Sequence, residues 1–135
     1  MDLLQSMNVS AGGMAAQSAR MKMISENIAN ADSVISDTGE AYRRKQIQFK
    51  AELDKATGLT NVKVDKITED TETPLKQVYQ PSHPAADARG FVMYPNVDTM
   101  VETVDMRESA RMYEANMQAI ESAKTMMARS LDLLK

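Results

Sequence analysis

Residues that could carry out chemistry are few in this sequence and far apart. The single histidine, His83, stands between two prolines, so metal binding or general-base catalysis would need partners from elsewhere in the chain. Cysteine is absent, which excludes disulfides, thiolate zinc sites and thiol nucleophiles. No glycine-rich phosphate loop, zinc-ligand spacing, calcium loop or nucleophile elbow occurs. The sequence therefore predicts a protein that is not an enzyme, with no catalytic residue, no metal and no cofactor.

Two short charged clusters have structural interpretations. The acidic run at residues 69–72 lies among threonines before a proline, which is typical of a solvated turn. Arg43, Arg44 and Lys45 are the one basic cluster. Adjacent cations on a strand alternate between its faces, so this cluster is expected either to protect a sheet edge or to contact an acidic neighbour.

Length and composition limit the kind of partner. A chain of 135 residues has room for one domain, or for a pair of helices with a modest insertion. The formal charge of -3 and the 4% aromatic content argue against a nucleic-acid surface. The uncharged stretch at residues 3–19 is too short and too polar to span a bilayer, and it lacks the basic start of a cleaved secretory signal. We expect no nucleic-acid partner and no stable membrane insertion.

Heptad rows of apolar residues mark both ends of the chain. A seven-residue spacing returns side chains to nearly the same side of an α-helix, so each end is expected to form one long helix with an apolar seam. A helix cannot bury its own seam, so the seams must pack on each other, on other chains, or on both. The predicted assembly seam consists of Met7, Met14, Met21, Ile28, Met106, Tyr113, Ile120, Met127 and Leu134.

Capping and breaking residues give the expected helix bounds. The first helix is expected to start at a cap on Asp2 and to end in residues 30–33, and the last to start after Pro95, capped by Asn96 or Asp98. The chain thus divides into an N-terminal helix at 1–33, a middle segment at 34–95 and a C-terminal helix at 96–135. Gly12 and Gly13 inside the first helix are either a local weak point or a place where another helix approaches closely.

The middle segment has a different pattern. Ile47 and Phe49 alternate with polar residues, residues 61–67 alternate too, and residues 57–60 suit a turn between them. A β-hairpin is expected there, and extended loop is expected from Glu69 to Pro95. The predicted fold class is therefore mainly α with a small β or extended insertion.

Methionine is the commonest seam residue. Twelve methionines occur, and at helical spacing they indicate packing more often than a cofactor site. Methionine is unbranched and adaptable, which suits a subunit with non-identical neighbours. Asn116 lies near the seam, where a polar side chain can fix the register of packed helices.

Short motifs in both terminal regions resemble the signatures of bacterial flagellar axial proteins. The first lies at residues 25–33 and continues to Tyr42, and the second begins at Pro95. The Ala-Asp-Ser continuation with a glycine-containing turn before Tyr42 is most similar to the proximal-rod branch of this rod and hook family. The motif residues are Asn27, Ala29, Asn30, Ala31, Asp32, Ser33, Tyr42, Pro95, Asn96, Val97, Asp98, Arg111, Tyr113, Glu114 and Asn116.

The resemblance implies a structural subunit of the proximal rod of the flagellar basal body. Such a subunit assembles helically with other proximal and distal rod proteins and with copies of itself, transmits torque and forms part of the export channel. It leaves the cytoplasm through the type III export apparatus without a cleaved signal and resides in the periplasmic rod. Its terminal helices form an antiparallel, coiled-coil-like pair joined by the middle segment, and we expect them to be loosely ordered before docking.

A second function class stays open from the residues alone. A cytoplasmic helical-hairpin adaptor or export chaperone would use the same seams to hold one partner. Such a protein would remain a discrete oligomer, whereas a rod subunit would co-assemble with other rod proteins.

Overall fold

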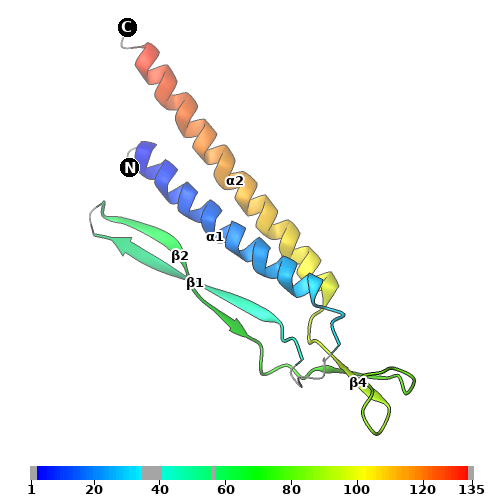
Figure 1. Cartoon of the computed structure of the whole chain (residues 1–135). Helices are drawn as coiled ribbons and strands as arrows, with labels where there is room; N and C mark the ends of the chain where they lie inside the picture. The colour runs from blue at the N-terminus through cyan, green and yellow to red at the C-terminus, as the bar shows by residue number, and fades with distance from the viewer. Residues whose placement is uncertain (1–2, 35–40, 56, 134–135) are drawn as a thin grey trace.

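The computed structural model describes residues 3–34, 41–55 and 57–133. It contains two long helices and two small antiparallel hairpins (Figure 1). The elements are α1 (Leu3–Ala29), β1 (Lys45–Asp54), β2 (Leu59–Glu69), β3 (Lys76–Tyr79), β4 (Phe91–Tyr94) and α2 (Thr99–Asp132). The predicted class, mainly α with a small β insertion between long terminal helices, is confirmed.

The helices run antiparallel, so both chain ends lie at one end of the molecule and the connecting segments at the other (Figure 1). Helix α2 begins at Thr99 because the Asp98 carboxylate accepts hydrogen bonds from the backbone N–H groups of Met100, at 2.9 Å, and Val101. Helix α1 ends at Ala29, and the chain turns through Asn30. The expected cap on Asp2 lies outside the described residues.

Two contacts fix the register of the helix pair. The Asn27 amide of α1 donates to the Glu102 carboxylate of α2 at 3.0 Å. Fourteen positions away on each helix, a Cβ added to Gly13 would lie 2.9 Å from the Asn116 side-chain nitrogen. Of the two interpretations of the glycines, close approach of a helix is therefore confirmed for Gly13.

The buried residues of the helices are more often small or polar than large and apolar. Those of α2 are Glu102, Ser109 and Ala123, which lie on one heptad row with Asn116. Those of α1 are Ser10, Ala16, Met23, Ile24 and Asn27. The tightest contact therefore runs beside the methionine rows, which flank it.

The β1–β2 hairpin has one apolar face because of a bulge. Ile47 pairs with Ile67 and Phe49 with Val64, and the register shifts between Gln48 and Phe49. Ile67 and Val64 are three positions apart and would face opposite sides of a regular strand, whereas the extra residue places both on one face. This confirms the predicted hairpin.

The β1–β2 hairpin lies along α1 (Figure 1). At Gly12 an added Cβ would be 3.8 Å from the Val62 carbonyl oxygen, and the Lys45 ammonium lies 3.1 Å from the Glu26 carboxylate. Helix α1 is therefore covered on one side by α2 and on another by β2.

The expectation of extended loop from Glu69 to Pro95 was wrong in part, because residues 76–79 and 91–94 pair as a second hairpin. Each of its strands has only four residues, too few for alternation to be visible beside the prolines of the connecting loop. Gly90, at φ 83°, makes the tight turn into β4, and a Cβ there would lie 2.9 Å from the Tyr79 ring.

No helix within residues 3–34, 41–55 and 57–133 is long and apolar enough to span a bilayer.

Candidate assembly site: a polar clasp and the helix surfaces

A network of polar side chains joins the end of α1, the entry to β1 and the start of α2. We call its members Asn27, Tyr42, Arg44, Asn96 and Glu102 the polar clasp. Asn27 and Glu102 are 0% exposed and Asn96 is 7% exposed. Buried polar groups are stable only when they are hydrogen-bonded, so the partners of these side chains decide what the clasp does.

Both the nitrogen and the oxygen of the Asn27 side-chain amide make two hydrogen bonds. Its nitrogen donates to the Lys45 carbonyl and to the Glu102 carboxylate, both at 3.0 Å. Its oxygen accepts from the Tyr42 hydroxyl at 2.8 Å and from the Lys45 backbone N–H at 2.9 Å. One side chain of α1 thus connects the helix to the first residue of β1 and to α2.

Glu102 is a buried carboxylate with a charged partner. The Arg44 guanidinium donates to it at 2.6 Å and also lies 3.5 Å from the Asp105 carboxylate. A buried charge is tolerated when it is paired and its remaining lone pairs are satisfied, and Asn27 supplies the second bond. The pair holds the entry to β1 against the first turn of α2.

Asn96 extends the network into the connecting loops. Its oxygen accepts from the Arg44 backbone N–H at 2.8 Å, and its nitrogen donates to the carbonyls of Asp70 and Thr73. Beside it, the Lys76 ammonium donates to the Val97 carbonyl. The second hairpin is thereby fixed to the segment that leads into α2.

Two pKa shifts follow from this packing. Burial raises the pKa of Tyr42, partly opposed by the nearby Lys45 ammonium. The hydrogen bond to Glu26, together with the charge of that carboxylate, raises the pKa of Lys45. Both shifts favour the forms that donate hydrogen bonds.

The basic cluster contacts acceptors rather than protecting a sheet edge. Arg44 binds Glu102, Lys45 binds Glu26, and Arg43 donates to the Asp70 carbonyl at 3.3 Å. Of the two roles expected for the cluster, the contact with acidic neighbours is the one found for Arg44 and Lys45.

The predicted seam residues lie along the helix pair and are incompletely covered. Those that are half-buried in the single chain are Met7, Met14, Met21, Met106, Tyr113, Ile120 and Met127. Ile28 is 36% exposed, and Leu134 lies outside the described residues. Their role in binding other subunits stays a prediction.

The motif residues have different surroundings. Asn27, Tyr42 and Asn96 belong to the clasp, whereas Asn30, Ser33 and Asp98 make the hydrogen bonds that end α1 and start α2. Ala31, Pro95 and Val97 are buried, Tyr113 and Asn116 are half-buried, and Ala29, Asp32, Arg111 and Glu114 are exposed.

The pairing of Arg44 with Glu102 is the contact that sequence reasoning missed. Its signal lay in the heptad row that leads from Glu102 through Ser109 and Asn116 to Ala123, where small residues indicate the closest contact between helices. A glutamate in such a row needs a cationic partner. The one basic cluster of the chain, next to Tyr42, was the available source.

The residues first considered for chemistry lie in turns. The His83 ring nitrogen accepts from the Ala85 backbone N–H at 3.1 Å. The Asp70 carboxylate accepts from the backbone N–H and the hydroxyl of Thr73 and from the backbone N–H of Glu72, and these bonds lower the pKa of Asp70. Across residues 3–34, 41–55 and 57–133, no three histidine, aspartate or glutamate side chains gather in a way that could hold a metal ion.

Two family models match the terminal regions, which hold most of both helices and the clasp residues Asn27, Asn96 and Glu102. Residues 7–34 match the model described as "Flagella basal body rod protein", and residues 88–133 match "Flagellar basal body rod FlgEFG protein C-terminal". The class defined by these matches is that of the flagellar basal-body rod proteins.

Full-length relatives narrow the class to one family. The chain is 43% identical to flagellar basal-body rod protein FlgC of Agrobacterium fabrum, over 100% of this chain and 98% of the relative. It is 38% identical to FlgC of Salmonella typhimurium over 98% of each chain, and 36% identical to FlgC of Bacillus subtilis over 100% of each. The chain belongs to the FlgC family of flagellar basal-body rod proteins.

Proposed function

We propose that this protein is a structural subunit of the proximal rod of the bacterial flagellar basal body, where it assembles helically with other rod proteins and with copies of itself. The observation that carries the proposal is the full-length similarity to FlgC proteins from distant bacteria. An adaptor or chaperone that holds one partner is not favoured, because relatives that match over this length are rod proteins.

The helix pair supports the assembly role. The methionine rows on α1 and α2 are only half-covered within one chain, and Met112, Met117 and Met126 of α2 are 43–51% exposed. Burying one such side chain contributes about 1.5–3 kcal/mol. A few of them at each contact are enough to hold a subunit among its neighbours.

The clasp supports a role in bearing load. A torque-transmitting subunit must move as one body, and the clasp joins both helices to both hairpins through a network of hydrogen bonds. The chain acts without catalysis or cofactor, reaches the rod through the type III export apparatus, and contributes to the wall of the export channel in the periplasm.

The test combines localisation with surface substitutions. The tagged chain should be found in intact basal bodies purified from its own cell. Met126→Asp should reduce its incorporation and the swimming speed, because a charge replaces an exposed apolar contact. Lys66→Glu on β2, also an exposed position, is the control and should leave both unchanged.

Absence of the tagged chain from purified basal bodies would overturn the proposed function. Normal incorporation and swimming with Met106→Asp, Ile120→Asp and Met127→Asp would overturn the assembly role of the seam alone.

A further inference from the structure

A further heptad row of α2 stays exposed in the folded chain. Its exposed members are Met112 at 48%, Ala119, Met126 at 51% and Leu133 at 88%. The first three follow by three positions the residues Ser109, Asn116 and Ala123, whose row contacts α1. Residues three apart are neighbours on a helix, so the exposed row runs along the edge of the helix pair.

The same row begins at the clasp. Asp105, seven positions before Met112, lies 3.5 Å from the Arg44 guanidinium. The clasp end of the row therefore has its partner within the chain. Beyond Asp105 the row is apolar and open to water, and its two thioethers stand 14 positions, or about 21 Å, apart along the helix.

The thioether is the group of this row that mild oxidants modify. A sulfur lone pair attacks one oxygen of hydrogen peroxide, an S–O bond forms, the O–O bond breaks and water leaves. The sulfur is oxidised by two electrons to a sulfoxide, and the peroxide is reduced by the same two. The product is a polar, chiral side chain in place of an apolar one, which disrupts methionine-rich contacts.

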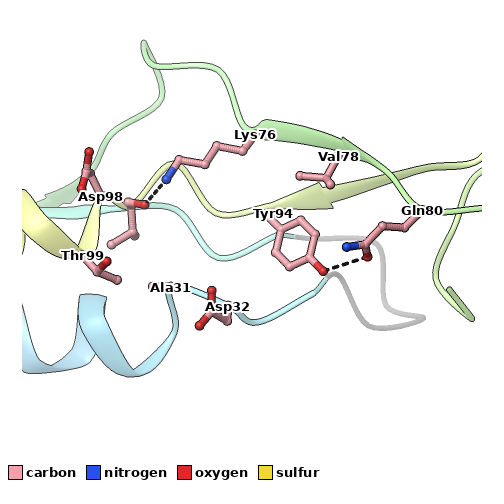
Figure 2. Close-up of a pocket in the computed structure, with 9 residues that line it drawn as sticks. Ala31, Asp32, Lys76, Val78, Gln80, Tyr94, Asp98 and Thr99 are labelled. Atoms are coloured by element: carbon pink, nitrogen blue, oxygen red, sulfur yellow. Dashed lines mark hydrogen bonds between the residues drawn. The ribbon is translucent and has the colours of Figure 1, made fainter.

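Other methionines of the chain provide internal references. Met23 of α1 is 6% exposed, so peroxide has little access to it. Met100 is 77% exposed but lies outside the row, in the first turn of α2. It follows Asp98 and Thr99, which line the groove beside the second hairpin (Figure 2). Met100 therefore reports oxidation of an accessible methionine at the clasp end.

We propose that Met112 and Met126 form an oxidation-sensitive site. Oxidants of the peroxide class convert both side chains to sulfoxides in the free subunit, and the modified subunit is excluded from the rod. The fold stays intact, because both side chains are already exposed and the added oxygen breaks no core contact. Methionine sulfoxide reductases reverse the change. This inference deepens the proposed function and rests on it.

The first experiment treats the purified full chain with hydrogen peroxide and follows each methionine by peptide mass spectrometry. Met112, Met126 and Met100 should be oxidised at least about tenfold faster than Met23, since the oxidant must reach the sulfur. Circular dichroism of the oxidised chain should show unchanged helix content. Oxidation of Met23 as fast as the other three, or loss of helix content, would overturn the proposal.

The second experiment is a competition in the protein's own cell. A chain carrying Met112→Leu and Met126→Leu keeps an apolar row without sulfur, because leucine replaces methionine at similar volume. It is co-expressed with the wild-type chain under a different tag, and the ratio of the two is measured in purified basal bodies. Sublethal peroxide should raise this ratio at least about threefold above its own value without peroxide. Both chains share one cell, so damage to other proteins cancels.

Met100→Leu is the matched control for the competition. It removes one accessible sulfur outside the row, so its ratio to the wild-type chain should not change with peroxide. An equal rise for Met100→Leu would overturn the assignment to Met112 and Met126. An unchanged ratio for the double leucine variant would do the same.

A measurement on the wild-type chain alone covers the case in which the double variant fails to incorporate. In peroxide-treated cells, sulfoxide at Met112 and Met126 should be at least about threefold rarer in the basal-body chain than in the unincorporated chain. Equal sulfoxide content in both would overturn the proposal while leaving the rod function in place. Absence of the chain from basal bodies without peroxide would overturn the rod function and this inference together.

Discussion

At the end of the helix pair where the connecting segments enter, Glu102 is fully buried and Asn27 makes four hydrogen bonds. At the other end, Leu131 and Leu133 are 60% and 88% exposed. The first end is complete within one chain, because its polar groups find all their partners there. The second leaves the apolar surface of Leu131 and Leu133 in water, where contact with another subunit would bury it. We therefore predict that stability and assembly depend on opposite ends of the same two helices.

The largest effect should come from breaking the clasp. Glu102→Ala leaves Arg44 and the Asn27 amide without their shared acceptor, and we expect the free energy of unfolding to fall by about 3–5 kcal/mol. Chemical denaturation followed by circular dichroism measures it. Glu108→Ala, at an exposed position of the same helix, should change stability by less than about 0.5 kcal/mol. Equal effects of the two substitutions would mean that the buried Glu102 stabilises the fold no more than an exposed glutamate does.

Among apolar residues, substitution of a buried side chain should cost far more stability than substitution of an exposed one at the end of α2. Ile24 is 1% exposed, and Ile24→Ala should lower the unfolding free energy by about 2–4 kcal/mol through lost burial and a cavity. Leu133→Ala should change it by less than about 0.5 kcal/mol, because the side chain is already in water. Thermal unfolding of dilute protein compares them. A large loss with Leu133→Ala would mean that the free end is packed within the monomer.

Alanine substitutions at the two adjacent glycines of α1, Gly12 and Gly13, should change stability in opposite directions. Gly12→Ala should stabilise by about 0.5–1 kcal/mol, since the new Cβ meets nothing closer than 3.8 Å and alanine favours the helix. Gly13→Ala should lose this gain and be at least about 1 kcal/mol less stable than Gly12→Ala, because its Cβ meets Asn116 at 2.9 Å. Denaturation midpoints compare them. In an Asn116→Ala background, the stability difference between Gly12→Ala and Gly13→Ala should become smaller. An unchanged difference would argue against steric contact with Asn116 as the reason why Gly13→Ala is less stable.

The smallest effect should appear at alkaline pH. The folded-state pKa of Tyr42 is raised above 10.0, so its contribution to stability is complete below pH 10.0 and is lost as the pH rises through the folded pKa. Ionisation removes the proton that Tyr42 donates to Asn27. Between pH 9 and 11 the wild-type chain should lose about 0.5–1 kcal/mol more than Tyr42→Phe. Parallel pH profiles of the two chains would contradict this role of the hydroxyl.

The helices and the first hairpin could be predicted because their signals are local. Heptad spacing and the absence of glycine and proline after Pro95 define α2, and alternation at Ile47 and Phe49 defines β1. The bulge opposite Gln48 and the four-residue strands of the second hairpin are not visible in any local period. They depend on which strand lies beside which, and that is decided by the folded chain.

The clasp shows the same limit for the candidate site. The motif resemblance indicated Asn27, Tyr42 and Asn96, but their mutual contact joins residues up to 75 positions apart, as in the bond between Asn27 and Glu102. No spacing rule gives such a contact. The heptad rows located the methionines on the helix pair, yet residues of small volume take the closest positions, because only they let the two backbones approach.

The contacts of Asn27 with Glu102 and of Gly13 with Asn116 have equal separations along the two helices. Sliding one helix by a turn would break both at once, pulling a buried carboxylate from its donors while driving a larger residue into the space above Gly13. The pair therefore resists shear along its length. A force applied at the C-terminal end of α2 therefore displaces both helices and the two hairpins together, as one rigid unit.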